Sequence, residues 1–283
     1  MDMPYITIGI LGSGQLGRML AMAAAQLGIK THIFAPDANN SPAGEMASTA
    51  TTAAYDDYAA LDQFAASVDV ITSEFENVPS ETMAHLAQFR QVSPGTSALH
   101  IAQHRVREKK FARQHGILTP DFWHVTDAAS LHQAMAELRG RGVLKTCQLG
   151  YDGKGQIWID PSDDLDASFA ALGSDDAILE TAVDFAAEAS FLVARAADGR
   201  IAHFPASLNA HKNGILVRSV APAPIGENLV TSGQQAVQRL AEAMELVGVL
   251  ALETFVTTDD KLLFNEIAPR PHNSFHWTIE GCA

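Results

Sequence analysis

Short apolar runs and glycine-rich turns alternate along the first third of the chain. An apolar run at residues 5–11 is followed by the turn Gly12-Ser-Gly-Gln-Leu-Gly17. Apolar residues then recur at helical spacing until Gly28, which can end that helix. Further apolar runs at residues 31–34 and 68–73 predict the next strands. The order strand, glycine turn, helix, strand predicts an α/β unit with a parallel sheet.

The pattern changes near residue 100, where we place a domain boundary. Residues 93–96 read Ser-Pro-Gly-Thr, which is typical of a turn. A basic helix is predicted after it at residues 104–115, ended by Gly116. Later strands are predicted at residues 143–146, 156–159, 177–180, 189–194, 203–207 and 214–220, and an amphipathic helix at residues 233–247. Such a run of strands favours an α+β region.

Two apolar runs near the end of the chain, at residues 250–256 and 262–267, flank the dipeptide Asp259-Asp260. This pattern predicts a β-hairpin. With the two aspartates as a two-residue tip, counting back along both strands places Glu253 directly opposite Glu266.

Facing carboxylates destabilise a sheet unless something compensates their charge. A divalent cation would do so, and clusters of oxygen ligands suit magnesium bridging to phosphates. Asn265 adds an oxygen, and Arg270, His272 and Asn273 follow with groups that can hold an anion. The alternative is an ordinary surface hairpin whose carboxylates point to water, because short motifs often match by chance.

The first glycine turn matches the dinucleotide-binding fingerprint through Gly12, Gly14 and Gly17. A NAD site also needs an acidic residue at the end of the next strand, about 20 positions on. That strand ends in Phe-Ala-Pro, and Asp37 lies beyond it. We therefore expect a Rossmann-like turn without NAD, whose helix N-terminus can still bind a phosphate.

A second glycine-rich loop spans residues 148–155 between two predicted strands. Its glycines allow the backbone to approach a phosphate closely, and Lys154 adds positive charge inside it. Lys145 lies on the preceding strand. The loop is not a Walker loop, and a hairpin tip with glycines chosen for turn geometry is the alternative. The strand lysine favours phosphate binding.

The composition is that of a globular protein large enough for about two domains, with 283 residues. The net charge of −14 argues against a general nucleic-acid binder, and two cysteines are too few and too scattered for a disulfide framework or a zinc site. No apolar run approaches the roughly 18 residues of a membrane span, and the N-terminus lacks a basic signal region. We expect no membrane partner and a cytoplasmic location.

Taken in order, the motifs resemble the ATP-grasp superfamily, and within it the N5-carboxyaminoimidazole ribonucleotide synthetases. The matching segments are Gly12-Ser-Gly-Gln-Leu-Gly-Arg-Met19, Glu74-Phe-Glu-Asn-Val78, Gly150-Tyr-Asp-Gly-Lys-Gly-Gln156, His211-Lys-Asn-Gly-Ile-Leu216 with Ala221-Pro-Ala223, and Asn265-Glu-Ile-Ala-Pro-Arg-Pro-His-Asn-Ser274 with His276-Trp277. They spread over essentially the whole chain, and the second and last are specific to the synthetases.

This resemblance implies a Rossmann-like pre-ATP-grasp domain at residues 1–100, followed by a two-part ATP-grasp fold. The small lid subdomain would span residues 101–183, and the large subdomain residues 184–283. ATP would lie between the last two. The family continues past the His-Trp motif, so we expect this chain to be C-terminally incomplete. Phe275 stands where the family commonly has glycine, and we expect it to reshape the pocket wall.

The resemblance also assigns residues to roles. The ATP-binding set is Arg105, Lys109, Lys145, Gly150, Tyr151, Asp152, Gly153, Lys154, Gly155, Gln156, Glu180, Thr181, Ala182, Val183, Glu188, His211, Asn265 and Glu266. The acceptor-binding set is Gly14, Gln15, Leu16, Glu74, Tyr151, Asp152, Lys154, Arg270, His272 and Asn273. The metal ligands are Glu253 and Glu266, and the catalytic residues are Arg270, His272 and Lys145.

The implied reaction is ATP-dependent carboxylation of 5-aminoimidazole ribonucleotide by bicarbonate, through carboxyphosphate. Magnesium is the implied cofactor, with manganese as a substitute, and a homodimer is the implied assembly. Two alternatives stay open on the sequence: another ATP-grasp enzyme of purine synthesis, such as formate-dependent glycinamide ribonucleotide transformylase, and a non-catalytic ATP-binding fragment.

Overall fold

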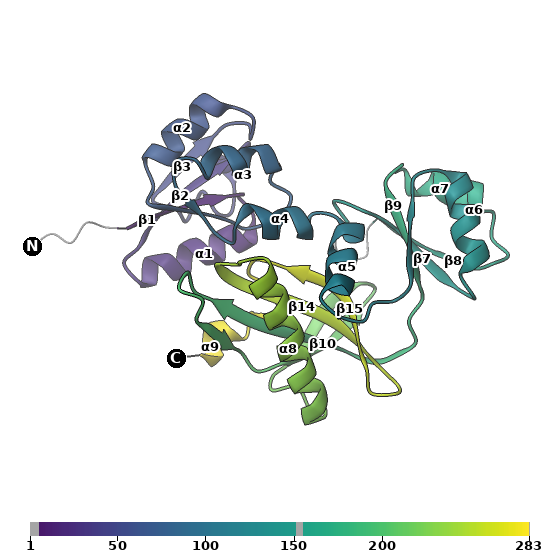
Figure 1. The fold of residues 1–283 in the computed structure, drawn as a ribbon. Coiled ribbons are helices and arrows are strands. Elements are labelled where there is room, and N and C mark those ends of the chain that lie inside the picture. Colours follow the sequence, from purple (N-terminus) through teal and green to yellow (C-terminus); the bar gives the residue numbers. More distant parts are fainter. Residues whose placement is uncertain (1–5, 151–154, 283) are drawn as a thin grey trace, which may run out of the picture.

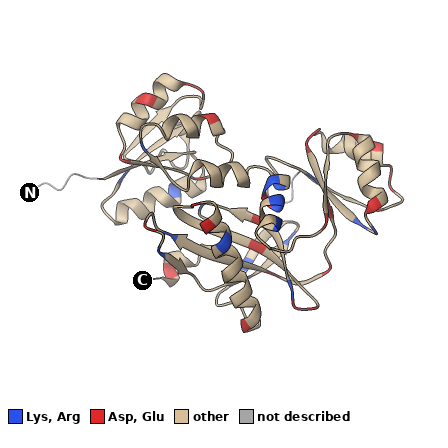
Figure 2. Ribbon diagram, in the orientation of Figure 1, with Lys and Arg blue, Asp and Glu red and all other residues tan. Residues whose placement is uncertain are grey.

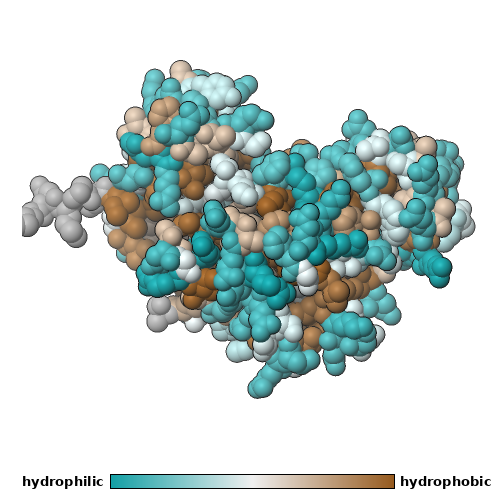
Figure 3. Space-filling model, viewed as in Figure 1, coloured by the Kyte–Doolittle hydropathy of each residue, from teal (hydrophilic) through white to brown (hydrophobic). Residues whose placement is uncertain are grey.

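The computed structural model describes residues 6–150 and 155–282. Within these residues the strands form three successive sheets (Figure 1). In the described part of the chain, no helix is long and apolar enough to cross a membrane. Hydrophilic side chains cover most of the face seen in Figure 3, with smaller apolar areas between them.

The first sheet is parallel, as predicted, and its strand order is β3-β2-β1-β4-β5. Its strands are β1 (Thr7–Leu11), β2 (Lys30–Ala35), β3 (Thr49–Thr52), β4 (Val70–Ser73) and β5 (Gln91–Val92). Its helices are α1 (Gln15–Gln26), α2 (Tyr58–Ala66), α3 (Ser80–Leu86) and α4 (Thr96–Ala102), with the short 3-10 helix η1 (Ala38–Asn40). Leu11, Phe34 and Phe64 pack in its core.

The second sheet is antiparallel and has the strand order β6-β9-β7-β8. Its strands are β6 (Phe122–Val125), β7 (Gly142–Thr146), β8 (Gln156–Ile159) and β9 (Ala177–Thr181). Helices α6 (Ala128–Glu137) and α7 (Leu165–Leu172) contact each other and pack on it through an apolar cluster that includes Leu131, Leu144 and Leu179. Asp127 and Ser130 form a capping box that starts α6.

The third sheet is also antiparallel and has the order β13-β12-β10-β14-β15, with β11 beside β10. Its strands are β10 (Phe185–Arg195), β11 (Ile201–His203), β12 (Ser207–Lys212), β13 (Ile215–Val220), β14 (Gly248–Thr257) and β15 (Leu262–Ala268). Helix α8 (Glu227–Ala243) packs on β10 and β14, and α5 (Arg105–Gln114) packs on β15. The chain continues through η2 (Asn273–Phe275) and α9 (Thr278–Gly281).

Two predicted elements differ from the structure. The strand predicted at residues 203–207 is wrong, because β11 ends at His203 and β12 begins at Ser207. Pro205 lies between them and has no N–H to continue a ladder. The helix predicted at residues 233–247 begins six residues earlier, at Glu227, and ends at Ala243.

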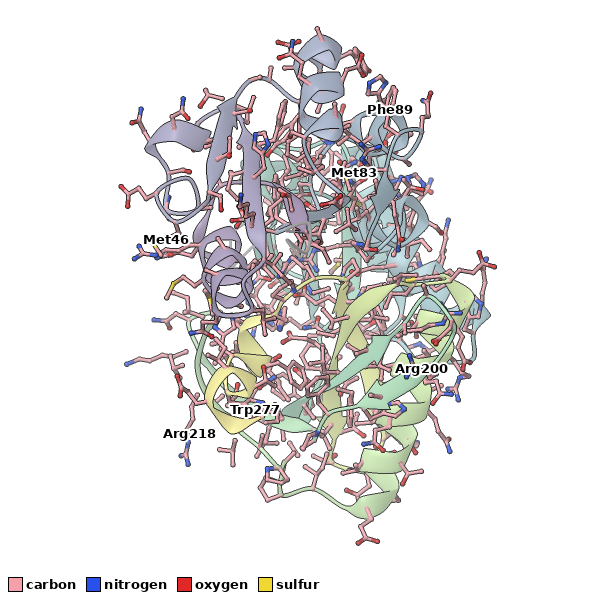
Figure 4. All side chains as sticks on the ribbon, turned by 90° about the vertical axis from the view of Figure 1, so that its left-hand side faces the viewer. Met46, Met83, Phe89, Arg200, Arg218 and Trp277 are labelled. Carbon is pink, nitrogen blue, oxygen red and sulfur yellow. The ribbon has the colours of Figure 1, made fainter. Side chains whose placement is uncertain are left out.

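The C-terminal segment folds back onto the third sheet. Figure 4 places Trp277 beside the strands of this sheet, where its indole N–H donates a hydrogen bond to Ser207 Oγ at 2.9 Å. Phe275 is buried with Leu192, Ala251 and Ala268 in a small apolar cluster. This bond and this packing hold the residues that follow β15 against the sheet.

Candidate active site

The hairpin of β14 and β15 pairs Glu253 with Glu266, which confirms the predicted pair. The predicted two-residue tip is wrong, because the Thr257 N–H donates to the Lys261 carbonyl at 2.9 Å and leaves three residues in the loop. The longer loop shifts the register of the two strands by one residue. A β-bulge, in which Asn265 is an additional residue on β15, shifts it back. The two irregularities cancel, which is why simple counting found the right pair.

The two carboxylates of this pair have different surroundings. Burial, and then the nearby charge of Glu266, raise the pKa of Glu253 to about 8. Burial would also raise the pKa of Glu266, but Arg105, whose Nη1 lies 3.1 Å from Glu266 Oε2, outweighs it and lowers the pKa to about 2. Glu253 therefore lacks a strong cationic partner in the described structure.

His272 completes a small group of metal-binding atoms with the two glutamates. One ligand atom of each of Glu253, Glu266 and His272 lies within 4.8 Å of the others. Burial, and then the charge of Arg270, lower the pKa of His272 to about 4, so its ring is neutral at pH 7. A divalent cation fits this group, because two carboxylates that repel each other would share its charge.

Two lysines, Lys145 and the fully buried Lys109, meet at Glu180, the last but one residue of β9. Lys145 Nζ lies 3.0 Å from Glu180 Oε2, and Lys109 Nζ lies 3.3 Å from Oε1. Burial would raise the pKa of Glu180, but the two lysines lower it to about 2. Lys109 also donates to the carbonyl of Asn265 at 2.8 Å, so the β-bulge turns that carbonyl toward the lysine. Strand β9, helix α5 and the hairpin therefore share one charge network.

Arg270, just after β15, is paired with the loop that follows β4. Its Nε donates to Glu76 Oε2 at 2.5 Å and its Nη2 to Oε1 at 3.2 Å. This two-point contact joins the first sheet to the third. His272 hydrogen-bonds to Ser274 Oγ through Nδ1 at 2.8 Å and caps η2.

Glu188 on β10 and His211 on β12 form a pair on another part of the third sheet. His211 Nδ1 lies 2.5 Å from Glu188 Oε2. This hydrogen bond raises the pKa of His211 against the opposing effect of burial. Both side chains were predicted to bind nucleotide, and the structure brings them together.

The first glycine turn is filled by a carboxylate. The amide N–H of Gly17 donates to Glu74 Oε2 at 2.5 Å, and that of Gly14 donates to Oε1. A side chain on Gly12 would collide with Glu74, which explains the glycine there. The Gly14 and Gly17 amides are therefore already bonded to Glu74, and phosphate binding at this helix N-terminus stays a prediction.

These groups surround a cavity of about 920 Å³, a size suited to a small-molecule ligand. Most predicted site residues within the described ranges line it: Leu16, Arg105, Lys145, Gly150, Gln156, Glu180, Thr181, Ala182, Val183, Glu188, His211, Glu253, Asn265, Glu266, Arg270, His272 and Asn273. The cavity receives residues from all three sheets.

Some predicted residues are placed elsewhere. Gly14, Gln15, Glu74, Lys109 and Gly155 are absent from the cavity lining. Lys109 is fully buried behind the wall. Tyr151, Asp152, Gly153 and Lys154 lie outside the described residues.

Two further residues were not assigned a role from the sequence. Glu76 lines the cavity and holds Arg270, and the Glu-Phe-Glu-Asn motif was the signal for it. Glu108, buried in α5, accepts the Ile267 N–H at 3.3 Å. Phe275 is absent from the cavity lining and packs in the apolar cluster instead, so its effect on the pocket wall stays a prediction.

Comparison with known proteins shows which protein family the chain belongs to. Residues 5–103 match the model of the ribonucleotide synthetase preATP-grasp domain, and residues 110–283 match that of the ATP-grasp domain. N5-carboxyaminoimidazole ribonucleotide synthase of Brucella melitensis is 47% identical over 282 residues, 99% of this chain and 78% of that protein. The Bacillus subtilis synthase is 40% identical over 279 residues, 99% of this chain and 73% of that protein.

Solved structures of the same enzyme family are also similar to this chain. The N5-carboxyaminoimidazole ribonucleotide synthetase of Thermus thermophilus superposes with a TM-score of 0.89 at 40% identity, covering 97% of this chain and 74% of that one. The Aspergillus clavatus enzyme in complex with ADP and 5-aminoimidazole ribonucleotide gives a TM-score of 0.86 at 27% identity, covering 98% and 73%.

The three sheets and the charged cavity between them define an ATP-grasp enzyme with a preATP-grasp domain. Within that class, the chain belongs to the N5-carboxyaminoimidazole ribonucleotide synthase family.

Proposed function

We propose that this protein carboxylates 5-aminoimidazole ribonucleotide at the expense of ATP, in purine biosynthesis. The observation that carries the proposal is the single cavity wall shared by the Glu253–Glu266 pair and the Arg270–Asn273 segment. A site for metal and phosphate and a site for an anionic acceptor therefore open into the same space. The names of the relatives supply the acceptor and the reaction.

We assign ATP to the part of the cavity between the second and third sheets. Residues 180–183 would hold the adenine, Glu188 the ribose, and Arg105, Lys145 and His211 the phosphates. Glu253 and Glu266 would hold magnesium, or manganese in its place. When bound, the ion would neutralise negative charge on the phosphates.

The proposed chemistry starts with bicarbonate. One of its oxygens attacks the γ-phosphorus of ATP, ADP leaves, and carboxyphosphate forms. Carboxyphosphate breaks down to carbon dioxide and phosphate. The exocyclic amine of the ribonucleotide then attacks the carbon and loses a proton, which forms the C–N bond. Lys145 and Arg270 would stabilise the charge that spreads over the transferring phosphoryl group.

We place the ribonucleotide near Leu16, Arg270, His272 and Asn273. His272 is neutral at pH 7, but its pKa of about 4 makes it a weak base. Its proposed part is therefore to accept or donate a hydrogen bond at the acceptor site. Glu74 would act by holding the first glycine turn in shape.

The domain limits at residues 100 and 183, a homodimeric assembly and a cytoplasmic location complete the proposal. They are supported by family resemblance. The assembly can be measured by light scattering of the purified chain.

Product formation tests the proposed function. The chain is incubated with ATP, magnesium, bicarbonate and 5-aminoimidazole ribonucleotide, and release of phosphate is followed together with the carboxylated product. We expect release to require both bicarbonate and the ribonucleotide. Glu266→Gln should lower kcat at least about 100-fold, the scale of losing one preorganised electrostatic group.

The control separates the acceptor from the ATP site. Formate and glycinamide ribonucleotide replace bicarbonate and 5-aminoimidazole ribonucleotide in a parallel reaction. Turnover with formate, or phosphate release that ignores the aminoimidazole, would show that the acceptor assignment is wrong while the ATP site stands.

A further inference from the structure

A second group of metal-binding side chains lies at the junction between α5 and the second sheet. His104 directly precedes α5, His124 lies in β6, Cys147 follows β7 and Asp176 directly precedes β9. One ligand atom from each of the four lies within 4.8 Å of the others. These residues are distinct from the Glu253–Glu266 group.

The four side chains already point at one centre. Asp176 Oδ2 lies 3.1 Å from His104 Nε2, and Oδ1 lies 2.8 Å from His124 Nε2. The thiol of Cys147 is hydrogen-bonded to the same carboxylate. The carboxylate of Asp176 therefore contacts two imidazole rings and one thiol.

Backbone contacts hold the ligands in place without a metal. The Cys147 N–H donates to the Asp176 carbonyl at 2.9 Å, and the Arg105 N–H donates to the Cys147 carbonyl at 3.0 Å. Cys147 is 2% exposed, whereas the side chains of Asp176 and His124 are 38% and 42% exposed. The cluster is therefore rigid at its base and open to entry from solvent.

We propose that His104, His124, Cys147 and Asp176 form a zinc site that fastens the second sheet to α5. Two imidazole nitrogens, a thiolate and a carboxylate make up a tetrahedral zinc set, whereas magnesium prefers oxygen ligands alone. On binding, the thiol proton leaves to solvent and the sulfur bonds to the metal.

The charge balance of the site supports zinc. A doubly charged ion with one thiolate and one carboxylate is neutral, so the neighbouring Arg107 does not oppose it.

The proposed zinc site lies next to two residues of the cavity assigned to ATP. His104 is followed by Arg105, which holds Glu266, and Cys147 lies two residues after Lys145, which holds Glu180. Zinc at this junction would therefore fix two nucleotide-facing side chains relative to each other. The proposal does not depend on the acceptor substrate.

Cobalt substitution tests the site directly. The full chain is stripped with a chelator and titrated with Co²⁺, which gives a near-ultraviolet charge-transfer band when a thiolate binds it. We expect one equivalent of Co²⁺ to produce this band and one equivalent of Zn²⁺ to abolish it. Cys147→Ser should remove the band and weaken zinc binding beyond the about 10–100-fold typical of changes around a metal site.

Three comparisons keep the result unambiguous. Cys282→Ser changes the other cysteine, which is exposed, and should keep the band. His124→Ala removes a half-exposed ligand, so it should fold normally by circular dichroism yet bind zinc weakly. Zinc should also raise the unfolding temperature of the wild type and not that of His124→Ala. Absence of the band, its loss in Cys282→Ser, or unchanged zinc affinity in both Cys147→Ser and His124→Ala would overturn the proposal.

Discussion

Glu108 is an acid buried inside α5, where its side chain accepts the Ile267 N–H next to Glu266. Burial, partly offset by the charges of Lys109 and Arg105, raises its pKa to about 8. The folded protein therefore holds this proton over a pH range in which the unfolded chain has released it. Stability must fall as pH rises from about 4.5 to about 8, because the native state binds more protons there.

Glu108→Gln mimics the protonated form and should remove this dependence. We expect the variant to match the wild type near pH 5 and to be more stable by up to roughly 5 kcal/mol above pH 8, since a rise from 4.5 to about 8 is worth about 1.4 kcal/mol per pKa unit. Urea unfolding at the two pH values measures the difference. Equal destabilisation of the variant at both pH values would mean that Glu108 is needed as a carboxylate.

Single elements connect these residues across the molecule. Arg105, Glu108 and Lys109 lie three and four positions apart on α5, so they share one helix face. Figure 2 shows the concentration of positive residues on this helix. The helix was predicted from the sequence as basic, but its burial was not, because only the packing of β15 against it makes the charged face an interior one.

The link between the loop after β4 and the end of β15 rests on Glu76 and Arg270. Glu76→Gln would remove one partner of a largely buried charge pair, and Arg270 would lose its orientation. We expect the KM for the ribonucleotide to rise about 10-fold or more, while the KM for ATP changes little. Glu81→Gln, an exposed acid on α3, is the matched control and should leave both constants unchanged. An equal rise in both constants would contradict this role of Arg270.

At the scale of the whole molecule, the sequence predicted those features that depend on the local pattern of residues. The first parallel unit, the hairpin and the pairing of Glu253 with Glu266 followed from periodicity and turn residues. The second sheet was predicted only in part: strand β6 and helix α6 were missed. Strand β6 pairs with β9, which is more than 50 residues away in the sequence, and helix α6 is short. The capture of Glu74 by the first glycine turn joins residues about 60 positions apart, which no local pattern encodes.

The cavity exists only because the three sheets meet. Lys145 comes from the second sheet, Glu253 and Glu266 from the third, and Arg270 is held by Glu76 from the first. ATP with magnesium should bridge the second and third sheets and stabilise the fold. We expect the unfolding temperature to rise with ATP only when magnesium is present, and this rise to be lost in Glu253→Ala. A rise of the same size without magnesium would contradict the metal assignment.

The central claim is that ATP activates bicarbonate in this cavity for transfer to the ribonucleotide. Bicarbonate labelled with the heavy oxygen isotope tests it most directly, because the oxygen that attacks phosphorus stays on phosphate when carboxyphosphate breaks down. We predict that the phosphate released in the presence of 5-aminoimidazole ribonucleotide carries one labelled oxygen from bicarbonate. Phosphate whose new oxygen comes from water would contradict the account.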